Sequence, residues 1–222
     1  MIIMKKTALI SVFMLALLVG IASCHQPRIV MGVSNSASNP IAIGNPEVSK
    51  AYYGELNGQP DYYEIDSQTP FSLYVNILVP NTTGDRDRRF SVDVTDSPGN
   101  PVAFINGTNS SWAEFYEPFG QDSYLMGPEA RANVSAGNYK IKVFSQDNKG
   151  KYSLAVGELE AFPADEILNA MITVPILKIT FFRDPFYSIF FNIAGAGILA
   201  VIIVIIMLFF AIRSLIRRFW SK

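Results

Sequence analysis

Two apolar runs without a charged residue stand near the two ends of the chain. The first, residues 7–22, follows Lys5 and Lys6 and leads into small and polar residues. This is the order of basic n-region, apolar h-region and cleavage zone that marks a secretory signal. The second run is long enough to cross a hydrocarbon layer of ~30 Å at ~1.5 Å per helical residue. We therefore expect a signal peptide at residues 1–24 and one transmembrane helix at residues 186–212.

A short basic tail, residues 213–222, follows the second run. Because cytoplasmic flanks of membrane spans are enriched in Lys and Arg, we expect this tail in the cytoplasm and the residues before the span outside it. An uncleaved first segment would leave the same sidedness, since its lysines would also stay inside. The sequence thus predicts a single-pass protein of the cell membrane. The residues expected to anchor the helix at the lipid interface are Arg213, Arg217, Arg218 and Trp220.

Cys24 is the only cysteine of the chain. It ends the sequence Ile-Ala-Ser-Cys, which resembles a lipobox, and is therefore a candidate for lipidation after cleavage. Ordinary cleavage near Ser23 or Cys24 and an uncleaved helix are the alternatives. A single cysteine also means that no intramolecular disulfide stabilises the domain.

Between the two runs, short segments of alternating, β-branched or aromatic residues follow one another, separated by turn formers such as Asn57-Gly58 and Asn106-Gly107. We expect strands at residues 48–56, 62–66, 71–79, 90–95, 102–105, 113–116, 139–144 and 152–156. Without intervening helices, such strands favour an all-β fold, an antiparallel jelly-roll-like β-sandwich at residues 47–158. Residues 25–46, rich in Pro, Asn and Ser, are expected to be a linker.

The clearest alternation lies in residues 139–144 and 152–156. Tyr139, Ile141 and Val143 alternate with lysines in the first segment. The second segment repeats the pattern after a short turn that contains glycine. We expect the two segments to form a hairpin that covers one face of the core.

Residues 159–185 are predicted to form a membrane-proximal amphipathic segment. Pro163, Asp165 and Glu166 suit a helix N-terminus, where carboxylates face the positive end of the helix dipole. Apolar residues at helical spacing then follow, and Pro175 is expected to end or kink the helix. The apolar positions are Ile167, Leu168, Met171 and Ile172.

This segment has two alternative interpretations. It packs on the sandwich or lies at the lipid surface, with Lys178 and Arg183 near the headgroups. Alternatively, it docks onto another subunit. We expect membrane lipid as a partner, and either this segment or the transmembrane helix as a route to oligomers.

The composition excludes several classes of activity. With 18 Lys plus Arg against 19 Asp plus Glu, the net charge of -1 disfavours binding to nucleic acid. One histidine and one cysteine exclude Ser-His-Asp and Cys-His catalysis and multi-histidine metal sites. We expect no cofactor.

A family resemblance rests on the first and last strand segments of the middle region. Tyr53-Gly54-Glu55-Leu56 with residues 61–65, and residues 136–143 with 152–156, look like the bacterial and archaeal pre-peptidase C-terminal domain. The likeness covers roughly residues 47–158 and consists of strand and turn patterns. It implies a small extracellular β-sandwich with an accessory role. It implies no active site, since the peptidases of this family carry the module beside a separate catalytic domain.

Four positions satisfy the acceptor pattern for N-glycosylation on predicted turns: Asn81, Asn106, Asn109 and Asn133. The densest aromatic cluster includes Trp112, Phe115 and Tyr116. Such rings form an exposed surface for a sugar or a protein partner, or they pack in the core, which is the commoner case.

Carboxylates offer the remaining candidate chemistry. Asp85 and Asp87 flank an arginine in one loop, and Asp61 and Glu64 lie on one strand segment. Neither arrangement carries a motif that marks a calcium site or a glycosidase pair. Such residues are usually solvated.

The sequence therefore favours a noncatalytic, extracytoplasmic, membrane-anchored module. It would bind a protein or glycan partner or serve as an accessory subunit of a membrane complex. One alternative is a hydrolase that depends on carboxylates or a metal ion. Another is a GOLD-like cargo-receptor protein, which shares the order of β-sandwich, short helix, span and basic tail.

Overall fold

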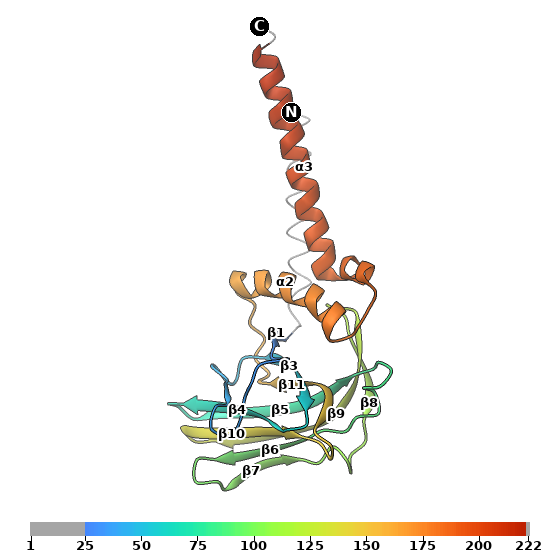
Figure 1. Cartoon of the computed structure of the whole chain (residues 1–222). Helices are drawn as coiled ribbons and strands as arrows, with labels where there is room; N and C mark the ends of the chain where they lie inside the picture. Colours follow the sequence, from blue (N-terminus) through green and yellow to red (C-terminus); the bar gives the residue numbers. More distant parts are fainter. Residues whose placement is uncertain (1–24, 221–222) are drawn as a thin grey trace.

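The computed structural model describes residues 25–220, and Figure 1 shows its layout. A β-sandwich forms the body, one helix lies across the sandwich, and a long helix projects away from it. The expected signal peptide and Cys24 lie outside the described residues.

Two sheets form the sandwich. The six-stranded sheet has the order β1 (Gln26–Ile29), β3 (Lys50–Asn57), β11 (Lys149–Val156), β5 (Phe71–Pro80), β9 (Asp122–Val134) and β8 (Ala113–Glu117). The five-stranded sheet has the order β2 (Ile41–Ala42), β4 (Asp61–Ser67), β10 (Gly137–Phe144), β6 (Ser91–Asp96) and β7 (Pro101–Ile105). Strands β3-β11-β5-β9 face β4-β10-β6-β7, which is the order of a jelly roll. The predicted fold class is confirmed.

The sheets are mixed, because β1 and β2 pair in parallel with β3 and β4. The expectation of a linker at residues 25–46 is therefore wrong for these strands. Val30 and Ile43 follow the two strands and are buried in the core between the sheets. Strands of two and four residues are too short to show an alternating pattern in the sequence. They form because the edges of β3 and β4 offer unpaired backbone groups.

The expected hairpin of the last two strands is also wrong. β10 lies between β4 and β6, whereas β11 lies between β3 and β5 in the other sheet. Ile141 and Leu154 are nevertheless both fully buried. Alternation determines which face of a strand is buried, but it does not determine the neighbouring strand.

The longest strand, β9, was not expected from the sequence. Gly127 and Pro128 interrupt it, and residues after them alternate small with polar side chains. The pairing of β9 with β5 shifts register between Asn76 and Leu78, opposite this interruption. A β-bulge thus accommodates residues that weaken a regular ladder.

Three helical elements follow the sandwich: α2 (Ala164–Thr180), the 3-10 helix η1 (Phe186–Phe190) and α3 (Ile193–Trp220). Pro175 does not end α2, because buried Val174 and Leu177 hold the helix on both sides of the proline. The apolar helix begins at Ile193 rather than at residue 186. The segment Ile193–Phe210 of α3 has a mean hydropathy of 3.1, and only 11% of its residues are buried. It is therefore long and apolar enough to cross a membrane.

Candidate functional site: the junction of sandwich and helices

The C-terminal half of α2 packs on the outer face of the six-stranded sheet. Leu177, Phe181 and Phe182 form a buried cluster with Leu78, Tyr124 and Ala155 of three strands. Phe181 meets the rings of Tyr53 and Phe182 edge to face. This face of the sheet is apolar because it is covered, which explains why β11 is buried on both sides.

A buried ion pair joins α2 to β9. Lys178 Nζ donates to Asp122 Oδ1 over 2.6 Å and to the Gln121 carbonyl over 3.3 Å. Lys178 therefore points into the protein, so the expectation that it lies near lipid headgroups is wrong. Burial, opposed by the Lys178 ammonium, raises the pKa of Asp122 to about 7.

Lys151 of β11 caps the C-terminus of α2 from the sheet side. Its Nζ donates to the carbonyls of Thr180, over 2.5 Å, and Phe181, over 2.8 Å. The last carbonyls of a helix have no intrahelical partner and carry partial negative charge, so an ammonium group stabilises them.

The N-terminal half of α2 is tied to β1. Arg28 binds the Glu166 carboxylate through both terminal nitrogens, over 2.9 and 2.5 Å. The hydrogen bonds to Arg28 lower the pKa of Glu166. The parallel strand at the sheet edge thus helps to orient α2.

The tip of the β8–β9 hairpin reaches the start of α3. Phe119 is buried against Ala170 and Val174 of α2 and Ala194 of α3, and its carbonyl accepts the Ile193 N–H over 3.2 Å. Asn192 caps α3, since its Oδ1 accepts the Gly195 N–H over 2.8 Å. The sandwich, α2 and the first turn of α3 therefore form one packed junction.

The predicted aromatic residues do not form one continuous surface. Trp112 is half-buried, stacks under the Arg89 guanidinium and donates its indole N–H to the Gly107 carbonyl. Phe115 and Tyr116 are exposed on β8, but neighbouring strand residues point to opposite faces. Each of these two rings is accessible by itself.

The asparagines of the four glycosylation patterns differ in their exposure. Asn109 and Asn133 are exposed, while Asn81 and Asn106 are half-buried. Asn106 is also engaged, because its Oδ1 accepts the backbone N–H of Asn109.

Two of the carboxylates singled out from the sequence, Asp61 and Asp85, are engaged in structural contacts. Asp61 accepts hydrogen bonds from Tyr152 and Asn35, and burial raises its pKa. Asp85 accepts the backbone N–H of Lys151. Within residues 25–220, no group of three His, Cys, Asp or Glu side chains is placed to hold a metal ion.

Arg213 and Arg217 are exposed near the end of α3, as expected for residues beyond an apolar span. Arg218 and Trp220 belong to the same helix. The sequence analysis, in contrast, did not identify the side chains of the junction, such as Asp122 and Lys151, as a site. The available signal was Lys178, a lone charge among apolar residues of a helix.

No family model matches the chain, and a search of curated proteins found no match. Among solved structures, the chain is similar to the pre-peptidase C-terminal domain of collagenase from Bacillus anthracis, with 16% identity and a TM-score of 0.35. This match covers 56% of the chain and 98% of that domain. This is the type of domain that the sequence resembles.

Two glycosidases also match. One is a family GH115 4-O-methyl-α-glucuronidase with specificity for decorated arabinogalactans, at 15% identity and a TM-score of 0.28, covering 57% of this chain. The other is a β-glucosidase from Paenibacillus barengoltzii, at 12% identity and a TM-score of 0.26, covering 60%. The matches span only 17% and 13% of these enzymes, so they transfer no activity.

Proposed function

We propose that this chain is a single-pass membrane protein whose β-sandwich lies outside the cytoplasm as a noncatalytic binding or accessory module. The observation that carries the proposal is the contrast along α3. Its first turn packs against Phe119 and is capped by Asn192, whereas its middle exposes apolar side chains such as Ile203, Ile205 and Phe209 to the surroundings. Such a surface is stable in lipid and unfavourable in water.

The packed junction supports an accessory role. A sandwich on a flexible tether would sample many orientations. In this protein, a buried ion pair and aromatic packing hold the sandwich to α2, which in turn packs against the first turn of α3. The sandwich therefore presents its strands and loops at a fixed height and angle to the membrane. We propose a protein or glycan as the partner, in keeping with the extracytoplasmic position.

Two measurements test this function. In a chain that carries Cys24→Ser, a membrane-impermeant maleimide applied to intact cells should label Phe104→Cys in the sandwich but not Lys222→Cys in the basic tail. The reverse pattern would refute the orientation. Affinity purification in mild detergent with mass spectrometry should then recover a stoichiometric membrane protein or a retained glycan. Turnover of a substrate by the purified chain would refute the noncatalytic assignment.

A further inference from the structure

The face of α2 that points away from the sandwich is apolar. Leu168 and Ile172 are 62% and 66% exposed, and Ile176 and Ile179 are also exposed. These residues recur at helical spacing, so they form one stripe opposite the buried residues Ala170, Val174 and Leu177. We call the four exposed residues the outer stripe.

A helix on a water-facing surface carries polar residues on its outer side. The outer stripe has none, and no charged residue occurs between Glu166 and Lys178. Lys178 itself is buried and bound to Asp122. A contiguous apolar surface of this kind indicates a partner with an apolar interior.

The position of α3 identifies that partner. α2 lies crosswise at the base of α3, between the sandwich and the side toward which α3 projects (Figure 1). From Ile193 to Ile212, α3 provides ~30 Å of uncharged helix at ~1.5 Å per residue, which matches the hydrocarbon thickness. Its first turn therefore lies at the hydrocarbon boundary, and α2, packed against that turn through Ala170 and Ala194, lies at the same depth.

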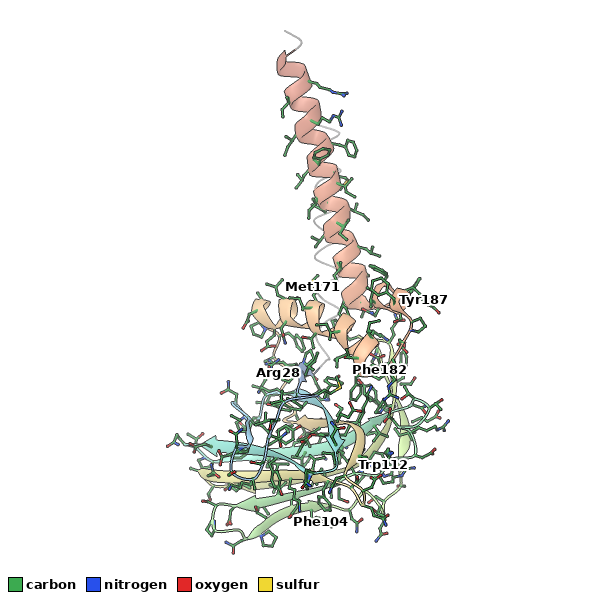
Figure 2. All side chains as sticks on the ribbon, viewed as in Figure 1. Arg28, Phe104, Trp112, Met171, Phe182 and Tyr187 are labelled. Carbon is green, nitrogen blue, oxygen red and sulfur yellow. The ribbon has the colours of Figure 1, made fainter. Side chains whose placement is uncertain are left out.

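The 3-10 helix extends this surface with aromatic rings. Phe186 and Tyr187 of η1 are exposed, as is Phe191, the residue that follows it. Figure 2 shows Tyr187 beside the base of α3, and Met171 on the side of α2 turned toward α3. Tyrosine is enriched at headgroup depth, where the ring is in an apolar layer and the hydroxyl in a wet one.

We propose that the outer stripe and the exposed rings of η1 lie in the outer leaflet of the bilayer that α3 crosses. This inference rests on the proposed function, because it requires that α3 spans the membrane. α2 then lies parallel to the membrane plane with its apolar side ~5–10 Å deep, as in interfacial helices. The sandwich rests against the bilayer through α2 and cannot tilt freely about α3.

The depth of single spin labels tests the arrangement. The full chain carries Cys24→Ser and one new cysteine, at Ile172, Ile203 or Phe104, and is reconstituted in phosphatidylethanolamine and phosphatidylglycerol vesicles. Ile203 is exposed in the middle of α3, and Phe104 is exposed on β7, far from α3 (Figure 2). Collision rates with oxygen, which enters lipid, and with a water-soluble nickel chelate are compared by electron paramagnetic resonance.

We expect a several-fold higher ratio of oxygen to nickel collisions at Ile172 and Ile203 than at Phe104. A label at Ile203 in lipid with a label at Ile172 in water would overturn the inference and leave the proposed function intact. Labels in water at both positions would overturn both. Labels at Ile172 that broaden each other's spectra and collide with neither reagent would show a second copy on the outer stripe, which also contradicts lipid contact.

Discussion

Lys178 and Asp122 form an ion pair of 2.6 Å whose side chains are only 4% and 7% exposed. The pair connects the C-terminal half of α2 with the start of β9, next to the hairpin tip that holds α3. Glu117 and Asp184 lie close enough to act on the Asp122 carboxyl, and both raise its pKa. This cluster of charges lies beside the apolar cluster of Leu177, Phe181 and Phe182.

Replacing Lys178 with methionine should destabilise the junction. The variant leaves Asp122 buried without its cation, and removal of one partner of a buried ion pair costs about 3–5 kcal/mol. We expect Lys178→Met to unfold at a lower urea concentration than the wild type when unfolding in detergent is monitored by tryptophan fluorescence. Lys140→Met, at an exposed lysine of β10, should leave the midpoint unchanged. Equal midpoints for both variants would contradict the assigned role of the pair.

Asp122 should make stability fall as pH rises. Its folded-state pKa of about 7 exceeds the ordinary 3.8, so between these values the folded state binds more protons than the unfolded state. The contribution of Asp122 is then complete below pH ~4 and lost as pH rises through about 7. Melting temperatures from pH 5 to 8 should decline more steeply for the wild type than for Asp122→Asn. Parallel profiles would show that Asp122 does not titrate in this range.

Gly195 and Gly197 offer a matched pair of tests at the base of α3. A Cβ at Gly195 would lie 2.1 Å from the Ile189 carbonyl oxygen, which is backbone and cannot yield. A Cβ at Gly197 would meet only the flexible end of Met171, at 3.4 Å. Gly195→Ala should therefore displace η1 and speed proteolysis between α2 and α3, whereas Gly197→Ala should not. Comparable cleavage of both would refute close packing of η1 on α3.

The sequence predicted strand positions well and strand partners poorly. Alternation in residues 139–144 correctly marked Ile141 and Val143 as core residues, because period two is a local property of a strand. Pairing depends on the path of the whole chain, so the crossing of β10 and β11 to different sheets was not visible. β9 was missed because Gly127 and Pro128 carry turn signals that tertiary pairing overrides.

The contacts of the junction could not be predicted from the sequence. The ion pair joins residues 56 positions apart, and the Lys151 cap joins β11 to carbonyls 29 and 30 positions away. No local pattern encodes such contacts. The apolar character of α2 was visible, but its division into a buried and an outer face depends on where the sandwich lies.

Lys151 should contribute to stability through its contacts with the end of α2. Lys151→Met keeps the length and apolar stem of the side chain but removes the donors to the Thr180 and Phe181 carbonyls. Loss of a charged donor to buried acceptors costs about 1–3 kcal/mol. We expect faster hydrogen exchange in the last turn of α2, measured by mass spectrometry. Lys149→Met, on the exposed end of the same strand, serves as the control and should exchange like the wild type.

Gly54 provides the last test, because it allows two tyrosines to join the sheets. Tyr152 lies over Gly54 and its hydroxyl bonds to that of Tyr63 over 2.7 Å and to Asp61 over 2.5 Å. A Cβ at Gly54 would lie 2.4 Å from the Tyr152 ring, so Gly54→Ala must displace the ring. Overpacking of this kind costs about 1–3 kcal/mol, and it should lower the melting temperature of the sandwich. Gly44→Ala, where a Cβ meets nothing within 4 Å, should melt like the wild type. Equal melting temperatures for the two variants would contradict the close packing of the Tyr152 ring on Gly54 of β3.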